Sequence, residues 1–314
     1  MFEPIDLSKL KTYSLSDRKS KVSTDDFAKT WKKGAGFKYF LDTLPNILAA
    51  SDIKEVISSV ATAYLNKKTV VFAMGAHVIK VGLNPIVIDL MERGIITAVA
   101  MNGAGIIHDF EIALTGQTSE DVAASLGDGA FGMARETCGF LCSAIKKAGQ
   151  ESLGLGQAVG LSMLENKLPF TDKSILATGS RLGIPVTVHI AIGTDIIHMH
   201  SEFDPKEAGG ASHRDFRTYS SVISSLEGGV YMNIGSAVIL PEVFLKAVTV
   251  VRNLGHQVEN FTTVNMDFMR HYRPMTNVVN RPVAKGGKGF NLVGHHEIML
   301  PLICAGVIEQ TEQQ

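Results

Sequence analysis

The chain has 314 residues, of which 45% are hydrophobic and 19% are charged. This composition excludes a disordered chain and suits one large domain with a buried core. The 30 basic and 31 acidic residues give a formal net charge of −1, so we expect no nucleic-acid partner and no attraction to a membrane surface. No run approaches the roughly 20 apolar residues of a membrane span, and the start lacks the apolar core of a secretory signal. A cytoplasmic protein is the expectation.

The three cysteines support a reducing compartment. Cys138 and Cys142 are four residues apart in a helical pattern, which places them on one face of a helix. Two buried thiols are the interpretation we adopt, and a redox or metal pair is the alternative.

Elements in chain order indicate an arm followed by one domain. Residues 1–30 are polar and predict an N-terminal arm, and residues 31–314 predict a single domain. Helical periodicity over 36–68 precedes a short apolar strand at 69–75. A helix from Val78 to Arg93 follows, with Gly94 after its end.

The alternation of strands and helices continues to the end of the chain. Further strands are predicted within 95–105, 183–195, 224–238 and 259–267, and further helices include 215–228 and 240–255. This alternation predicts an α/β fold, a Rossmann-like doubly wound and mostly parallel sheet with helices on both faces.

In such a sheet the ligand lies beyond the carboxyl ends of the strands. Glycine, histidine and acidic residues gather at or just after the predicted ends. They are Gly75, Ala76, His77, Asn102, Gly103, Ala104, Gly105, His108, Asp109, Asp195, His198, His200, Asp267, His295 and His296. Isolated histidines such as His77 and His108 are also typical of helix caps and polar cores.

The Asn102–Gly105 segment allows two interpretations. Its glycines suit a plain tight turn, and its backbone N–H groups at a helix start suit a pyrophosphate. The spacing differs from the GxGxxG fingerprint, so both interpretations stay open.

His198 and His200 flank one residue, and in an extended segment such side chains share a face. They are therefore candidate metal ligands, but hydrogen-bonding histidines in a polar pocket are the interpretation we adopt, and no metal is assigned. We predict that Asp195, His198 and His200 form the reactive centre, where a histidine moves a proton and Asp195 orients a cationic partner. Capping and polar packing are the alternative roles.

The segment 285–289, KGGKG, predicts a flexible loop that either closes over an anion or stays solvated. Glu120 and Asp121 are interpreted as structural, because Thr118 and Asp121 fit a capping box at a helix start.

Several blocks resemble the deoxyhypusine synthase family, and more narrowly its bacterial deoxyhypusine-synthase-like branch. They are MGAHVIKVGLNPIVIDLMERGIITAVAMNGAGIIHDFEIAL, TSEDV, GIPVTVHIAIGTDIIHMHS and HEIMLPLICAGVIE. The resemblance covers most of the chain from about residue 40. It implies NAD as the cofactor, a homotetramer with sites at dimer interfaces, and transfer of the aminobutyl group of spermidine through a lysine imine.

The resemblance also implies roles for single residues. Residues 75–77 match the turn that meets NAD, residues 102–104 match a Thr-Ala-Gly segment, and His108 with Asp109 matches an acidic pair beside the cofactor. Asp195 matches an aspartate that contacts the polyamine. His295 and His296 stand where the family has an Asp-Ala pair against the cofactor.

The chain departs from the family at the lysine motif. Its counterpart segment, RHYRPMTNVVNRPVAKGGKG, has no tryptophan and no acidic residue, and Leu240–Val243 replaces a triple-glycine segment. Lys285 or Lys288 could still supply an imine-forming amine. We therefore expect an NAD-dependent transferase or oxidoreductase that acts on a small substrate other than spermidine. A genuine deoxyhypusine or homospermidine-type aminobutyl transferase, a metal-dependent lyase or hydrolase, and a non-catalytic nucleotide-binding protein are the alternatives.

Overall fold

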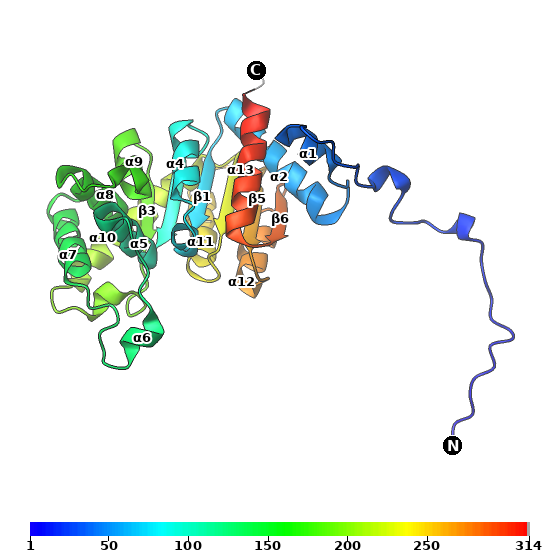
Figure 1. Cartoon of the computed structure of the whole chain (residues 1–314), viewed down its shortest axis with the longest axis horizontal. Helices are drawn as coiled ribbons and strands as arrows, with labels where there is room; N and C mark the ends of the chain where they lie inside the picture. The colour runs from blue at the N-terminus through cyan, green and yellow to red at the C-terminus, as the bar shows by residue number, and fades with distance from the viewer. Residues whose placement is uncertain (313–314) are drawn as a thin grey trace.

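The computed structural model describes residues 1–312 and has a six-stranded sheet at its centre (Figure 1). All strand pairs are parallel, and the strand order is β3-β2-β1-β4-β5-β6. The strands are β1 (Val70–Met74), β2 (Ala98–Asn102), β3 (Val186–His189), β4 (Val230–Ile234), β5 (Thr262–Asp267) and β6 (Lys288–Val293). The predicted doubly wound α/β sheet is confirmed.

Helices cover both faces of this sheet. The α-helices are α1 (Phe37–Thr43), α2 (Leu48–Leu65), α3 (His77–Lys80), α4 (Asn84–Glu92), α5 (Gly103–Thr115), α6 (Val122–Leu126), α7 (Arg135–Gln150), α8 (Leu155–Glu165), α9 (Ile175–Leu182), α10 (Pro205–Ser224), α11 (Ile239–Asn253), α12 (Tyr272–Pro274) and α13 (His296–Thr311). Short 3₁₀ turns lie at η1 (Leu15–Asp17), η2 (Thr24–Asp26), η3 (Thr171–Lys173) and η4 (Ile196–Met199), and η5 (Met275–Asn280) is a π-helix.

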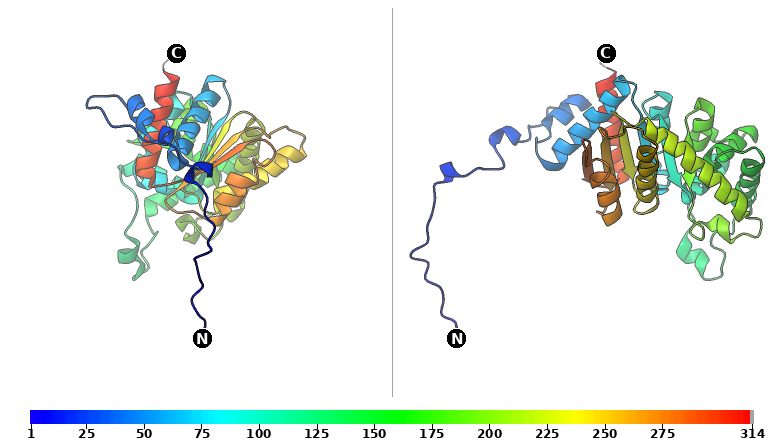
Figure 2. Two further views of the ribbon diagram at one scale, coloured as in Figure 1. Left: turned by 90° about the vertical axis from the view of Figure 1, so that its right-hand side faces the viewer. Right: turned by 180° about the vertical axis from the view of Figure 1, so that it is seen from behind.

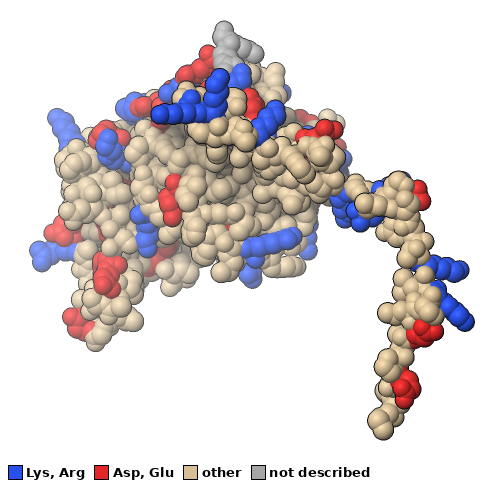
Figure 3. All heavy atoms as spheres, turned by 45° about the vertical axis from the view of Figure 1, so that its right-hand side comes forward, with Lys and Arg blue, Asp and Glu red and all other residues tan. Residues whose placement is uncertain are grey.

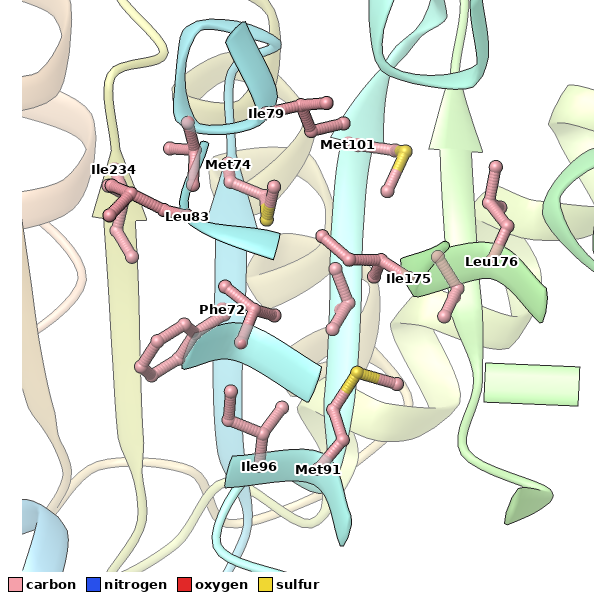
Figure 4. Close-up of a cluster of buried hydrophobic side chains, with 14 of the residues drawn as sticks. Phe72, Met74, Ile79, Leu83, Met91, Ile96, Met101, Ile175, Leu176 and Ile234 are labelled. Atoms are coloured by element: carbon pink, nitrogen blue, oxygen red, sulfur yellow. The ribbon is translucent and has the colours of Figure 1, made fainter. Parts of the chain in front are cut away.

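The core has two parts, one on each face of the sheet. The larger part packs strand residues such as Phe72 and Met74 against α2, α4, α9 and α13, as Figure 4 shows for a cluster around Met91 and Ile175. The smaller part lies under α10 and α11, where Tyr231 stacks on Phe244 with ring centroids 3.7 Å apart. Both faces of the central strands are buried, which explains their continuous apolar sequences.

The outer edge of β3 is closed by side chains of α10. The Asp215 carboxylate accepts the Val188 N–H at 2.8 Å and the Gly156 N–H at 2.9 Å. The Ser212 hydroxyl donates to the Val188 carbonyl at 3.0 Å and accepts the Ile190 N–H at 3.2 Å. Side chains thus satisfy backbone groups that another strand would otherwise pair.

Residues 1–35 run as an extended arm outside the body of the protein (Figures 1 and 2). Its end is joined to the region of α1 by hydrogen bonds from Lys29 N–H to the Thr43 carbonyl and from Asn46 N–H to the Asp26 carbonyl. Basic and acidic side chains are interspersed on the face that Figure 3 presents. Among residues 1–312, no helix is long and apolar enough to cross a bilayer.

Four predicted elements differ from the structure. The helix predicted at 215–228 is α10, which begins ten residues earlier, at Pro205, and ends at Ser224. The single helix at 78–93 is two helices, α3 and α4, because Gly82 adopts a left-handed φ of 78° and Pro85 begins a new helix. The third strand ends at His189, six residues before Asp195. The predicted loop at 285–289 contains the start of β6, which begins at Lys288.

The cysteine prediction agrees with the structure. Cys138 and Cys142 lie on α7, are buried and free, and have Sγ atoms 3.3 Å apart.

Candidate functional site

The strand order reverses between β1 and β4, and two glycines meet there. A Cβ atom on Gly75 would lie 2.4 Å from the Gly235 carbonyl oxygen, so only glycine fits this approach. Gly235 itself has a φ of +68°, which favours glycine. This crossing point is where doubly wound sheets bind dinucleotides.

Residues after β4 were missed by the sequence interpretation. Ser236 accepts the Leu240 N–H at the start of α11, and its carbonyl accepts from the Asn233 side chain at 2.9 Å. Asn233 also donates to Asn265, which donates to Asn291, so amides link β4, β5 and β6. The strand-then-glycine pattern of residues 230–236, which marks the other site turns, could have identified them.

His77, His296 and Asp267 gather beside this crossing point. The His77 and His296 rings meet edge to face with centroids 5.8 Å apart. Burial lowers the pKa of His296, although the Asp267 charge opposes that effect. The His296 Nε2 atom is buried and has no partner within the described chain. His296 is therefore a neutral polar group at the end of the sheet. His295, in contrast, is exposed and stacks on Phe268 at 6.3 Å.

The glycines at the start of α5 make room for neighbouring side chains. A Cβ atom on Gly103 would lie 2.0 Å from the Asp195 Oδ2 atom, and one on Gly105 would lie 2.6 Å from the Met101 sulfur. Asn102, the residue before the helix, has a buried Oδ1 atom with no partner in the described residues. Packing therefore explains why glycine occupies positions 103 and 105. Because α5 begins directly after β2, its first N–H groups lie at the carboxyl edge of the sheet.

Asp195 and His198 form a buried pair of unpartnered polar atoms. The backbone N–H groups of Gly193 and Asp195 donate to His198 Nδ1 at 3.1 and 3.2 Å, so that nitrogen carries no proton. Burial lowers the His198 pKa, and the proton of the neutral ring is therefore on Nε2. This Nε2 atom lies 3.9 Å from Asp195 Oδ2, and neither atom has a hydrogen-bond partner among residues 1–312.

The environment of the Asp195 carboxyl shifts its pKa toward neutral pH. Burial raises its pKa to about 6, and a hydrogen bond with Thr194 opposes the rise. At pH 7 the carboxylate form still dominates. The site thus places a hydrogen-bond acceptor opposite the His198 donor.

His200 and His198 have different hydrogen-bond partners. Residues 196–199 form a 3₁₀ turn, whereas the shared-face argument assumes an extended segment. His200 Nε2 bonds the Gly132 carbonyl at 2.8 Å, and because a carbonyl only accepts, Nε2 carries a proton. Among residues 1–312, no three His, Cys, Asp or Glu side chains converge on a metal position.

His108 and Asp109 lie on α5 but face different surroundings. His108 Nδ1 bonds the Thr118 hydroxyl at 2.7 Å, and burial lowers the His108 pKa. Asp109 is fully buried and holds the start of α9 by accepting the Ile175 and Leu176 N–H groups, both at 3.0 Å. We assign Asp109 a structural role.

A cavity of about 200 Å³ lies between α5 and the segment after β3. Its lining residues are Lys80, Ala104, Ile107, His108, Glu111, Ser119, Glu120, Val122, Phe131, Thr194, Asp195 and Ile196. Glu120, interpreted as structural, therefore faces this cavity and also accepts the Gly132 N–H at 3.1 Å. The predicted cap at Thr118 is instead Asp121, which accepts the Ala124 N–H. A cavity of about 260 Å³ at the β3 edge contacts Asp215, whose carboxylate already accepts backbone N–H groups.

Lys285 and Lys288 lie at the amino ends of β5 and β6, whereas the site lies at the carboxyl ends of the strands. Lys288 begins β6 and pairs with Glu55, and Lys285 pairs with Glu259 just before β5. Both ion pairs are exposed. Because the strands are parallel, these lysines are at the amino ends, and the described chain does not bring them to the site.

Comparison with known proteins shows the fold but no family. No protein-family model matches the sequence, and no curated protein matches it. Solved structures do match. AgrE in a ternary complex with ornithine and NAD⁺ superposes with a TM-score of 0.56 at 13% identity, covering 85% of this chain and 35% of AgrE.

Two further solved structures, of different proteins, share this fold with the chain. ArgZ, an arginine dihydrolase from the ornithine–ammonia cycle in cyanobacteria, matches with a TM-score of 0.53 at 15% identity, covering 87% of this chain and 34% of ArgZ. A candidate deoxyhypusine synthase from Entamoeba histolytica matches with a TM-score of 0.52 at 12% identity, covering 91% of this chain and 98% of its own. This chain thus spans about a third of the length of ArgZ and AgrE. These identities establish a shared α/β fold.

Proposed function

We propose that the protein is an NAD-dependent enzyme that binds the dinucleotide along the carboxyl edge of its sheet. The observation that carries this proposal is the pair formed by Asp195 Oδ2 and His198 Nε2, two buried and unpartnered atoms 3.9 Å apart. Burying such groups without a partner costs about 1–3 kcal/mol each. A ligand that forms hydrogen bonds with both atoms would remove this cost.

The chemistry of this pair fits a hydroxyl group. His198 Nε2 donates and Asp195 Oδ2 accepts, and a hydroxyl is the group that can accept from one and donate to the other. The 3.9 Å separation allows an intervening oxygen within about 2.7–3.0 Å of both atoms. Binding of ribose hydroxyls by an acidic residue is a general device of dinucleotide-binding sheets.

The surrounding features fit the remaining parts of the dinucleotide. The cavity of about 200 Å³ beside Asp195 is the proposed adenosine end. The N–H groups of Asn102–Gly105 at the start of α5 suit the pyrophosphate. The turns at Gly75 and Gly235 bring the two backbones close together at the crossing point and leave no room for a side chain at Gly75. The carboxylates of Glu111 and Glu120 at the cavity disfavour a further phosphate, so we expect NAD rather than NADP.

His77, His296 and Asp267 are proposed to face the reactive end. NAD supplies hydride transfer when it is bound. The orphaned His296 Nε2 atom of this buried, neutral ring can hydrogen-bond a substrate or the cofactor amide. His295 adds an exposed ring at the rim. We assign His198 and His200 roles in binding and orientation rather than proton transfer. Backbone groups determine which ring nitrogen carries the proton in each of them.

The substrate is proposed to be a small molecule other than spermidine. Aminobutyl transfer through an imine requires a lysine at the site, and Lys285 and Lys288 lie at the other edge. Neither of these two lysines can therefore be the covalent carrier of a deoxyhypusine-type reaction in this arrangement. The AgrE complex with ornithine and NAD⁺ supports a scaffold in which NAD and a small polar compound bind together.

We also propose a cytoplasmic homotetramer with sites at dimer interfaces. Apolar side chains that are more than half exposed surround the carboxyl ends of β5 and β6, namely Phe268, Met269, Tyr272, Val293 and Ile298. A second copy would cover them and enclose the reactive end. Light scattering of the purified protein measures the number of copies, and a monomer at micromolar concentration contradicts this assembly.

Titration calorimetry with NAD⁺ and NADP⁺ tests the cofactor. We expect NAD⁺ to bind and Asp195→Ala to weaken it at least tenfold, since one charge-assisted hydrogen bond contributes about 1.5–3 kcal/mol. Absence of NAD⁺ binding contradicts the proposal. Absorbance at 340 nm with a panel of small amines, amino acids and hydroxy acids then tests catalysis. Reduction of NAD⁺ with spermidine at an ordinary enzymatic rate would revive aminobutyl transfer, and binding without any turnover would favour a nucleotide-binding protein.

A further inference from the structure

The cavity beside Asp195 is roofed by one surface segment, residues 117–131. This segment includes α6 and contributes Ser119, Glu120, Val122 and Phe131 to the cavity wall. No residue from 119 to 131 is buried. Figure 1 shows α6 projecting from the body on the same side as α12, which follows β5. The segment has no core of its own, so its position depends on a few polar contacts.

Those contacts lie at its two ends. At the first end, the Thr118 hydroxyl bonds His108 Nδ1 at 2.7 Å and donates to Glu111 at 2.5 Å. At the second end, both backbone groups of Gly132 are held. Its N–H donates to Glu120 at 3.1 Å, and its carbonyl accepts from His200 Nε2 at 2.8 Å.

The ends of the segment also carry glycines in the left-handed region. Gly116, Gly129 and Gly132 have φ values of 72°, 75° and 77°. Gly132 additionally packs on the 3₁₀ turn that carries His198, because a Cβ atom there would lie 2.8 Å from Ile196 Cβ. Positions of this kind can absorb backbone rotation without the strain that other residues meet.

The Asp195 Oδ2 and His198 Nε2 atoms are buried in this structure. Both are shielded from solvent when the segment is closed, yet the proposed ligand hydroxyl must reach them. We propose that residues 117–131 form a lid over the nucleotide end of the site and that His200 is its latch, a positioning residue that acts through the Gly132 carbonyl. This inference rests on the proposed function for the identity of the ligand, and on the contacts of Gly132 for the moving part.

The latch is tested by changing the donor at position 200. His200→Leu removes the hydrogen bond, whereas His200→Gln keeps an N–H donor on a side chain of similar reach. His256→Leu, at an exposed histidine in the loop after α11, is the matched control. Hydrogen exchange of peptides covering 117–133 is measured by mass spectrometry for each protein, with and without saturating NAD⁺, together with the NAD⁺ dissociation rate and the Tm.

We expect about tenfold faster exchange in 117–133 and about tenfold faster NAD⁺ release for His200→Leu, corresponding to the loss of one hydrogen bond. His200→Gln should restore most of both, and His256→Leu should change neither. NAD⁺ should slow exchange of the segment in the wild type. An unchanged segment in His200→Leu overturns the latch, and so does faster exchange spread equally over α7 and β3, which indicates general destabilisation.

The two proposals fail separately. If NAD⁺ does not bind the wild type, the proposed function fails, but exchange in the ligand-free protein still decides whether His200 holds the segment. If NAD⁺ binds and releases at the same rate from wild type and His200→Leu, the lid fails and the cofactor assignment stands.

Discussion

Replacing Asp195 with asparagine should stabilise the fold at neutral pH and weaken ligand binding at the same time. Burial raises the pKa of Asp195 from its ordinary 3.8 to about 6, and this difference corresponds to about 3 kcal/mol of unfavourable free energy for the buried charge. Asparagine has nearly the same shape and carries no charge. The variant therefore removes a cost that the wild type carries only when the carboxyl is ionised.

The pH window follows from the direction of the shift. Between about pH 4 and pH 6 the folded protein holds the Asp195 proton and the unfolded chain does not, so wild-type stability falls as pH rises. Above pH 6 both states are ionised and the cost is complete. The stability difference between Asp195→Asn and wild type should thus grow by about 2–3 kcal/mol from pH 4 to pH 8.

Urea unfolding of both proteins at several pH values measures this difference, and comparison with the wild type cancels the other titrating groups. Calorimetry on the same samples should show NAD⁺ affinity reduced at least tenfold, because the amide nitrogen no longer accepts where Oδ2 does. A stability difference that is constant from pH 4 to pH 8 would refute the reasoning about burial. Undiminished NAD⁺ affinity in the variant would refute the ligand role.

Four other substitutions distinguish residues of the site from residues outside it. Gly103→Ala should displace the Asp195 carboxylate, because the new Cβ lies 2.0 Å from Oδ2, and calorimetry should show at least tenfold weaker NAD⁺ binding. Gly75→Ala should lower stability by about 1–3 kcal/mol, measured by urea unfolding, since the Cβ would meet a backbone oxygen at 2.4 Å. Lys285→Ala and Lys288→Ala should change stability by less than about 1 kcal/mol and leave NAD⁺ affinity unchanged, because both ion pairs are exposed and remote. A large loss of NAD⁺ binding in either lysine variant contradicts the placement of the site.

The sequence predicted the sheet well, because buried parallel strands have a simple signature. The apolar run at 70–74 followed by Gly75 identified both a strand and the turn beyond it. β6 was missed because it begins with Lys288 and Gly289 and has one buried residue, Leu292, so it lacks that signature. The sequence of such an edge strand predicts a loop instead.

The candidate site was predicted by position but not by chemistry. Asp195 and His198 lie at the expected edge, but the shared-face argument for His198 and His200 fails at a 3₁₀ turn that the sequence does not reveal. The protonated nitrogens of both rings depend on backbone groups of Gly193 and Gly132, which only the folded chain brings near. Glu120 reaches the cavity through tertiary packing alone.

The closed edge of β3 has a consequence for how copies of this chain can meet. A bare outer strand is a template on which a neighbouring chain can add its own strand, and continuous sheets and aggregates grow in that way. Here Asp215 and Ser212 already occupy N–H and carbonyl groups of Val188 and its neighbour Ile190. Growth of the sheet stops at this strand. Contacts between copies of this chain therefore cannot extend the sheet at β3 and must use other surfaces.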